Sequence, residues 1–427
     1  MIVLKSADSV CDAIRLKGGM RMDGANPKTS PYAVLPLSLL VLMMLAAGPN
    51  LGGQTILETQ PETLPRQAHH KGWWPNDGSA PRSAYAGSQS CAPCHAAEFA
   101  GWQASEMATA LKPAAQSEFL RAHPNLSFDW GSYTYRIDLD KNVAMYSVTD
   151  GNGTLTAPLL WAYGVGVVGQ AFVFLLQGTY YEAEVAYYPE LGRLDLVAGI
   201  PREVPATIQR AFGIPLLPTA AQQCISCHTT AAVTENRLHT DSAMPGDSCE
   251  ACHGPGARHV AVMKTVANSA KRIPKLIFNP ASLAPADLED FCGACHRTSL
   301  RVQAKGLHGL DTVHYEPYRL ELSLCWIMSQ QITCLTCHDP HKPLERKSSA
   351  YDDACIACHS QGTRTQVSAR RGVHSGRVCP VARQDCATCH MPKCRLPLSP
   401  FSMSDHFIRI VSTNDACSQS ATQATRH

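Results

Sequence analysis

Aromatic side chains, net charge and long apolar runs are all scarce in this chain. Aromatic residues make up only 7% of the 427 residues, so little material for a large side-chain core is present, and 29 prolines favour loops. The formal net charge is +2, which lacks the strongly basic balance of nucleic-acid-binding proteins, so nucleic acid is not an expected partner. The apolar run at residues 33–47 is shorter than the roughly 20 residues of a permanent membrane-spanning helix.

Cysteine, in contrast, is abundant, and most of the 19 cysteines occur in seven C-x-x-C pairs that are followed at once by histidine. We number these motifs 1 to 7 along the chain. Two thiols and an adjacent imidazole attach a c-type haem, because the thiols add to the porphyrin vinyl groups and the histidine becomes the proximal iron ligand. The sequence therefore predicts seven covalently bound c-type haems with their iron. The motif residues are Cys91, Cys94 and His95; Cys224, Cys227 and His228; Cys249, Cys252 and His253; Cys292, Cys295 and His296; Cys334, Cys337 and His338; Cys355, Cys358 and His359; and Cys386, Cys389 and His390.

Zinc sites and disulfides also use this cysteine spacing and are the alternatives to haem. Neither needs a histidine directly after the second cysteine. With 18 His in the chain, a given position is histidine about 4% of the time, so seven coincidences have a probability on the order of 10⁻¹⁰. The motif pattern therefore favours haem.

The N-terminus is typical of an exported protein. The apolar run at residues 33–47 follows the basic residues Arg21 and Lys28, as in a signal peptide. An uncleaved N-terminus, and with it an association with the membrane, is the alternative. Export to the periplasm or the cell exterior agrees with the motifs, because bacteria attach c-type haem outside the cytoplasmic membrane.

Motif spacing divides the chain unevenly. No motif occurs between those that begin at Cys91 and Cys224, whereas six motifs follow one another from Cys224 to His390. We therefore expect a signal peptide at 1–48, an extended leader at 49–86, a first haem-binding segment at 87–126, a β-rich insertion at 127–212, a six-haem array at 213–410 and a disordered tail at 411–427.

The insertion has the alternating pattern of strands. Apolar and polar residues alternate over 128–139 and 143–149, and the turn Asp150-Gly-Asn-Gly follows. The segment 96–112 instead has helical spacing and ends at Pro113. The predicted fold class is a mainly α and irregular multihaem cytochrome c with a haem-built core, and with a small antiparallel β insertion between haem 1 and haem 2 that covers the first haem.

The second axial ligand of each iron decides the function, because a strong ligand closes the iron to substrates and leaves electron transfer. Local context favours His239, His259, His341, His374 and His406 as these ligands. The carboxylate of Asp405 could polarise the ring of His406. Other candidates are His123, His308 and His314.

For motif 1, a methionine is a candidate ligand. Met107 stands twelve residues after His95 on the expected helix and could bind iron through its thioether. An ordinary core methionine is the alternative.

Four cysteines of the expected mature chain lie outside the motifs: Cys325, Cys379, Cys394 and Cys417. Three pairings into two disulfides are open to them, and Cys379 with Cys394, which bracket motif 7, is the first to test. A thiolate ligand or catalytic cysteine is the alternative.

Several segments resemble a known bacterial family. They are Cys249-Glu-Ala-Cys-His-Gly-Pro-Gly-Ala-Arg-His-Val, Pro317-Tyr-Arg-Leu-Glu-Leu-Ser-Leu-Cys, Cys334-Leu-Thr-Cys-His-Asp-Pro-His, Asp385-Cys-Ala-Thr-Cys-His-Met-Pro-Lys and Ser404-Asp-His-Phe. Over about residues 85 to 410, the chain is similar to bacterial multihaem cytochromes of the cytochrome c-552/c-554 type, which are often associated with tetratricopeptide repeats. The resemblance implies periplasmic electron transfer with mainly bis-histidine haems, and it supports His239, His259, His341, His374 and His406 as ligands. The chain departs from this family in two ways: tetratricopeptide repeats do not follow the haem region, and Cys394 stands where a basic residue is expected.

The predicted function is an exported electron carrier between periplasmic or membrane redox partners. The alternative is a multihaem oxidoreductase that acts on a small nitrogen or sulfur compound at one open haem. Such reductases commonly have lysine in place of the motif histidine at the active haem, whereas all seven motifs here end in histidine. A structural conduit is a third hypothesis. The sequence therefore implies redox protein partners and assigns no catalytic residue.

Overall fold

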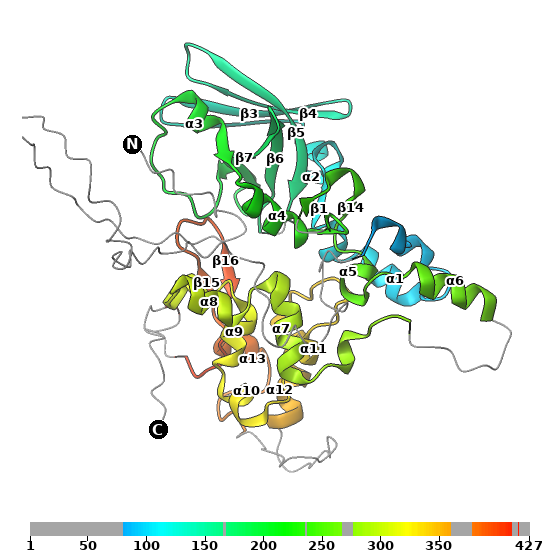
Figure 1. Ribbon diagram of the computed structural model, residues 1–427. Coiled ribbons are helices and arrows are strands. Elements are labelled where there is room, and N and C mark those ends of the chain that lie inside the picture. The colour runs from blue at the N-terminus through cyan, green and yellow to red at the C-terminus, as the bar shows by residue number, and fades with distance from the viewer. Residues whose placement is uncertain are drawn as a thin grey trace, which may run out of the picture. The chain divides into compact units, whose positions relative to one another are not determined.

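An antiparallel sheet and a set of short helices make up the described part of the chain (Figure 1). The protein is described by a computed structural model, which places residues 80–164, 168–234, 237–266, 276–359, 378–411 and Cys417. The predicted signal peptide, most of the leader, most of the tail and His374 lie outside the described residues. None of the helices in these described ranges combines the length and the apolar character needed to cross a membrane.

Eight strands of the described chain form one curled antiparallel sheet with the order β10-β7-β6-β5-β4-β3-β2, and β1 pairs with β5 off this path (Figure 1). The strands β2 to β7 are neighbours in sequence order, as in a meander. Strand β5 is central, because residues 154–158 pair with β4 while residues 161–163 pair with both β6 and β1. The strands are β1 (Leu111–Pro113), β2 (Asn125–Trp130), β3 (Tyr133–Asp140), β4 (Val143–Thr149), β5 (Thr154–Tyr163), β6 (Ala171–Leu176), β7 (Thr179–Ala183) and β10 (Gly213–Pro215).

Four two-stranded pairs accompany this sheet in the described residues. The pair β8–β9 is bridged to the chain before β6 by Gln170 and Tyr187. The pairs are β8 (Val185–Tyr188) with β9 (Arg193–Leu196), β11 (Thr229–Thr230) with β14 (Met244–Pro245), β12 (Val233–Thr234) with β13 (Arg237–Leu238), and β15 (Lys393–Arg395) with β16 (Ser402–Ser404).

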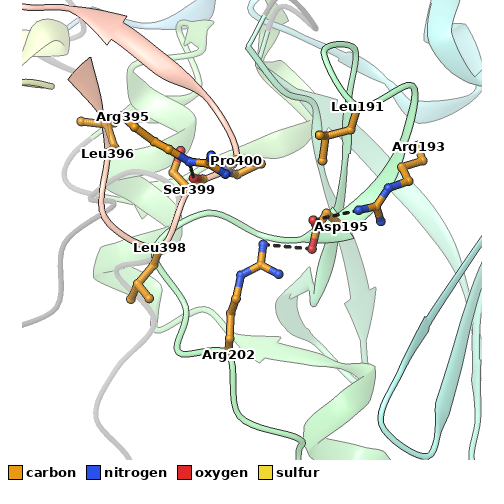
Figure 2. Close-up of a pocket in the computed structure, with 9 residues that line it drawn as sticks. All are labelled: Leu191, Arg193, Asp195, Arg202, Arg395, Leu396, Leu398, Ser399 and Pro400. Carbon is orange, nitrogen blue, oxygen red and sulfur yellow. Dashed lines mark hydrogen bonds and ion pairs between the residues drawn. The ribbon is translucent and has the colours of Figure 1, made fainter. Parts of the chain in front are cut away.

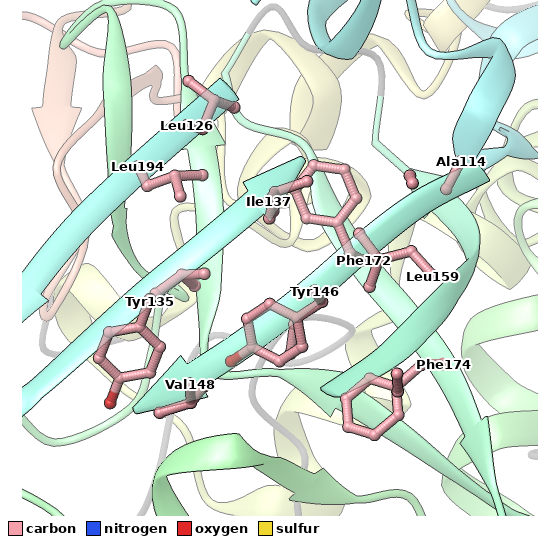
Figure 3. Packing of buried hydrophobic residues seen from close by; sticks show 14 of the residues in the cluster. Ala114, Leu126, Tyr135, Ile137, Tyr146, Val148, Leu159, Phe172, Phe174 and Leu194 are labelled. Atoms are coloured by element: carbon pink, nitrogen blue, oxygen red, sulfur yellow. The ribbon is translucent and has the colours of Figure 1, made fainter. Parts of the chain in front are cut away.

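The sheet has a side-chain core on each of its faces. Successive strand residues point to opposite faces, so β6 contributes Phe172 and Phe174 to one buried cluster and Val173 to the other. Figure 3 shows the first cluster, in which Tyr135, Tyr146, Phe172 and Phe174 come from strands β3, β4 and β6. This part of the molecule therefore has a core that does not depend on haem.

The helices are short, and most of the helices in the described residues lie in the segment of motifs 2 to 7. The buried clusters of this segment are small, since one contains only Leu288 and Phe291 and another Val302, Leu307 and Tyr315. Such clusters leave a core for haem faces to complete. The helices are α1 (Ala96–Gln103), α2 (Glu118–Ala122), α3 (Ile208–Phe212), α4 (Pro218–Ser226), α5 (Cys249–His253), α6 (Ala257–Val266), α7 (Pro285–His296), α8 (Ser299–Lys305), α9 (Glu316–Glu321), α10 (Leu324–Ser329), α11 (Cys334–Cys337), α12 (Asp352–His359) and α13 (Cys386–His390).

The prediction of a mainly α and irregular fold is wrong. Helix accounts for 38% and strand for 24% of the structure, so the fold mixes α and β. The β part is larger than predicted because β1 and β10, from outside 127–212, join the sheet. The helix expected over 96–112 ends at Gln103, since Leu111 is 3% exposed and its strand pairs with β5.

Candidate haem sites

Each described motif holds its first cysteine and its histidine about one helical turn apart. The backbone N–H of His95 donates to the carbonyl of Cys91 at 2.9 Å, and that of His338 donates to Cys334 at 2.9 Å. This spacing places both side chains on the same side of the turn. Motifs 3, 4, 6 and 7 lie within α5, α7, α12 and α13.

The motif thiols are largely available for attachment. Thirteen of the fourteen are free, and Cys224 is disulfide-bonded, so that thiol must be reduced before it can add to a vinyl group. The rings of His95, His296 and His359 are exposed, and the other motif histidines are partly buried. In the described ranges, no group of three or more His, Cys, Asp or Glu side chains is arranged to hold a metal ion by itself.

Three motif histidines are oriented by a backbone carbonyl. The Nδ1 atom of His253 lies 2.7 Å from the carbonyl oxygen of Phe278, that of His390 lies 2.8 Å from Arg409, and that of His228 lies 3.1 Å from Ala110. A carbonyl only accepts, so Nδ1 carries the proton and Nε2 keeps the lone pair that a metal binds.

Burial favours the neutral ring in two of these histidines. Burial lowers the pKa of His228 and the pKa of His253 below the ordinary histidine value. The neutral imidazole is the form that coordinates iron. Both rings are therefore prepared for coordination.

Two predicted sixth ligands lie close to motif histidines. The ring centroids of His341 and His253 are 6.0 Å apart with an interplanar angle of 10°, and those of His406 and His338 are 6.3 Å apart at 44°. Two imidazoles on opposite sides of one metal ion, with each nitrogen about 2 Å from it, have centroids roughly 6 Å apart. Each pair of rings thus has the separation that an iron between them requires.

The environment of His406 differs from the one predicted. Its Nδ1 lies 3.2 Å from the carbonyl oxygen of Ser404, while the carboxylate of Asp405 accepts hydrogen bonds from Arg319 and Arg409. Burial lowers the pKa of His406 to about 4, which keeps the ring neutral. The Ser404 carbonyl, and not Asp405, therefore orients this ring.

The other sixth-ligand candidates stay predictions. His259 lies on α6 with its Nδ1 enclosed, and that atom has no hydrogen-bond partner in the described structure, whereas His239 is exposed. Among the less favoured candidates, His123 stacks on Tyr187 at 5.3 Å, His308 is exposed and His314 places Nδ1 3.0 Å from Met403 Sδ.

Met107 does not lie on the helix predicted for it. It begins a 3₁₀ turn (Met107–Thr109) after α1 has ended, and its carbonyl accepts the N–H of Asp247 at 2.8 Å. That hydrogen bond holds the Met107 backbone beside Asp247, just before motif 3. Its ligation of iron stays a prediction.

The sheet contacts motif 2. A small apolar pocket is lined by Trp161 and Tyr163 of β5 together with Cys224 and His228. The ring of Tyr163 meets that of His228 edge-on at 5.7 Å between centroids. The expected role of the insertion was to cover the first haem, and these contacts place part of the sheet against the second motif.

Cysteines of different motifs lie together. The thiols of the first cysteines interact in three motif pairs, and those of the second cysteines interact in a fourth. Contacts between motifs far apart in sequence bring their attachment sites side by side. The contacts are Cys91 with Cys249, Cys292 with Cys334, Cys355 with Cys386, and Cys227 with Cys295.

The predicted disulfide is wrong. Cys394 pairs with Cys417, with an S–S distance of 2.17 Å and Cα atoms 5.5 Å apart, while Cys379 and Cys325 are free thiols. Cys394 is fully buried on β15, in a cluster with Leu396 that Cys417 contacts. Packing of the last hairpin, not proximity to motif 7, therefore selects the partner.

Figure 2 shows an open pocket of about 440 Å³ between the β8–β9 hairpin and the loop of the β15–β16 hairpin. Its charges come from Arg193, Arg202, Arg395 and Asp195, and the Asp195 carboxylate lies 3.1 Å from the Arg202 guanidinium and 3.6 Å from that of Arg193. The residues that line it include none from a motif. We therefore assign no haem to it.

Three buried acidic residues beside the motifs were not singled out from the sequence: Glu250, Glu289 and Asp352. Glu289 stands three residues before Cys292, and Asp352 stands three residues before Cys355. An acidic residue three positions before the first cysteine of two motifs was the sequence pattern that could have identified Glu289 and Asp352.

Comparison with known proteins agrees with the motifs. Residues 207–254 match the family model described as cytochrome c554 and c-prime. The multiheme cytochrome MtrA of Shewanella baltica (strain OS185) is 24% identical over 230 residues, which is 51% of this chain, and the match spans only 57% of that relative's length. The crystal structure of the outer cell wall cytochrome OcwA has a TM-score of 0.43 and 14% identity, over 78% of this chain and 81% of that one. With the seven motifs of the sequence, the family model and the MtrA match support the identification of this chain as a bacterial multihaem cytochrome c.

Proposed function

We propose that this protein is an exported heptahaem c-type cytochrome that carries electrons between periplasmic or membrane redox partners. The observation that carries the proposal is that two pairs of imidazoles lie about 6 Å apart, His253 with His341 and His338 with His406. An iron with imidazole on both sides has no open position for a substrate, so these sites serve electron transfer. When bound, the haems supply a one-electron change at each iron.

The chain's own residues attach and orient these groups. In each motif the two cysteines form the thioether bonds and the histidine supplies the proximal ligand. The carbonyls of Phe278 and Arg409 hold His253 and His390 with Nε2 available. His239, His259 and His374 are assigned as further sixth ligands on the sequence pattern, and Met107 as the thioether candidate for motif 1.

Export is part of the proposal. The sequence of residues 1–48 supports it, and so does the requirement of haem attachment for a compartment outside the cytoplasmic membrane. The partners are proposed to be redox proteins, because a protein without an open iron exchanges electrons only with other carriers.

Haem counting and ligand binding test this proposal together. The protein is produced in a bacterium that matures c-type cytochromes, and its intact mass should show seven added haems. Low-temperature EPR of the oxidised protein should show only low-spin iron, and the reduced protein should not bind carbon monoxide. Fewer than seven haems would refute the heptahaem assignment, and a high-spin, CO-binding iron would instead support the oxidoreductase alternative.

A further inference from the structure

We propose that Glu250, Glu289 and Asp352 are positioning residues that hold the attachment sites in three pairs: motifs 1 and 3, motifs 4 and 5, and motifs 6 and 7. We call these three side chains the carboxylate clips. This inference rests on the proposed multihaem function. It adds which haem attachment sites are neighbours in space. Each clip is at most 7% exposed. It lies within one motif of a pair or three residues before it, and it binds the backbone at or just before the other motif.

The first clip joins motifs 1 and 3. Glu250 follows Cys249 in motif 3, and its two carboxylate oxygens accept the N–H groups of Ala86 and Gly87 at 2.7 and 2.8 Å. These residues lead directly into motif 1. The hydroxyl of Ser88 accepts the N–H of Cys249 at 3.3 Å, so the two segments bind each other in both directions.

The second clip joins motifs 4 and 5. Glu289 lies on α7 one turn before Cys292, and its carboxylate accepts the N–H of Cys334 at 2.8 Å and the thiol of the same residue at 3.2 Å. The start of motif 5 is therefore tied to the helix that carries motif 4.

The third clip repeats this arrangement for motifs 6 and 7. Asp352 begins α12 one turn before Cys355, and its two oxygens accept the N–H groups of Asp385 and Cys386 at 2.8 and 2.9 Å. In all three pairs the first cysteines also lie in contact. Because each first cysteine would carry one thioether bond of its haem, the two haems of a pair would be held next to each other.

Contacts between the pairs arrange them in a row. His341, from the segment after motif 5, faces His253 of motif 3, and the ring of His338 in motif 5 meets Tyr351, next to α12, edge-on at 5.5 Å. Motif 2 joins at motif 4, because the Cys227 thiol lies 3.7 Å from the carbonyl oxygen of Ala294. Haem irons held at these sites would pass single electrons from one site of the row to the next.

The third clip offers the sharpest test, because its helix contains a matched control. Asp352→Ala removes both acceptors, whereas Asp353→Asn changes the charge of the next residue, whose side chain is exposed. Soret circular dichroism reports coupling between close haems. Asp352→Ala with seven haems should lose part of the coupled signal, and Asp353→Asn should lose none.

Peptide mapping of the attached haems covers the case in which the variant matures poorly. Loss of haem at motifs 6 and 7 together would support the clip, because one carboxylate then governs both sites. An unchanged coupled signal with seven haems, or loss at motif 6 alone, would overturn it. If Asp352→Ala yields no protein, Asp352→Asn replaces it in both measurements. The asparagine keeps one acceptor oxygen, and the same outcomes decide. A wild-type protein without haem would refute the proposed function itself. That result differs from one in which the wild type carries haem and only the role of Asp352 is refuted.

Discussion

The imidazole rings of His253 and His341 lie 6.0 Å apart, centroid to centroid, with their planes inclined by 10°. His253 belongs to motif 3, whereas His341 follows motif 5 in the sequence. Their separation fits one metal ion bound by both rings. If His341 is the sixth ligand proposed for motif 3, a histidine next to one attachment site would close the iron of another and would link the two sites mechanically.

Removal of His341 should open one iron. In His341→Ala the haem of motif 3 loses its second imidazole, so about one iron in seven should become high-spin and bind carbon monoxide when reduced. EPR and CO difference spectra measure both changes. Lys342→Ala, at the exposed residue next to His341, is the control and should remain low-spin. A low-spin, CO-inert His341→Ala protein would show that His341 is not a ligand.

A change of ligand type at His406 should change a potential instead. Methionine as axial ligand raises the reduction potential of haem iron relative to histidine. In His406→Met one haem should titrate higher by on the order of 100 mV, a fraction of the roughly 0.8 V that axial ligands span. Spectropotentiometric titration measures this shift, with Ile410→Met, at an exposed residue, as the control. Titration curves identical to those of the wild type would show that His406 is not an iron ligand.

Local patterns in the sequence were enough to propose the attachment sites and to predict much of the sheet. The motifs are five-residue units whose chemistry needs no distant partner, and strands β3 and β4 have the alternation of a half-buried sheet. Strands β1 and β10 have three residues each, too few to show a period, and they exist because β5 and β7 pair with them. The sheet was therefore predicted smaller than it is.

Contacts between residues far apart in the sequence could not be predicted from local patterns. The distance in sequence between Cys394 and Cys379 says nothing about which cysteine packs beside Cys394, and folding of the last hairpin selects Cys417. Likewise, the position of Asp405 next to His406 suggested a bond between them, but the carboxylate turns to the buried guanidinium of Arg319. The buried Asp405 carboxylate therefore pairs with a charged group from a distant segment and not with the residue next to it in the sequence.

That ion pair should be important for stability. Arg319 is 3% exposed and Asp405 is fully buried, so Asp405→Asn leaves a buried guanidinium without its charged partner. We expect a loss of about 3–5 kcal/mol in the free energy of unfolding. Denaturant unfolding of the haem-loaded protein measures it. Asp138→Asn removes the exposed pair with Arg136 and should cost less than about 1 kcal/mol. Equal costs for the two variants would contradict this assignment.

The same carboxyl should contribute a pH dependence. Burial alone would raise the pKa of Asp405, but hydrogen bonds and charge from Arg319 hold the pKa below the ordinary carboxyl value. A carboxyl with a lowered folded-state pKa stabilises the protein above its unfolded pKa, and that contribution is lost as pH falls through the lowered value. The difference in stability between wild type and Asp405→Asn should therefore shrink below about pH 4. Thermal unfolding across this range measures it, and parallel curves would refute the explanation.

The disulfide of the C-terminal hairpin makes a chemical prediction. Alkylation of the denatured, unreduced protein should label Cys325 and Cys379 and leave Cys394 and Cys417 unmodified, as peptide masses would show. Because the bond closes a loop with a sequence separation of 23, Cys417→Ser should lower the free energy of unfolding by about 3 kcal/mol. Cys379→Ser is the control and should change it little. Protection of Cys379 together with Cys394 would restore the pairing that bracketed motif 7, since a cysteine in a disulfide cannot be alkylated.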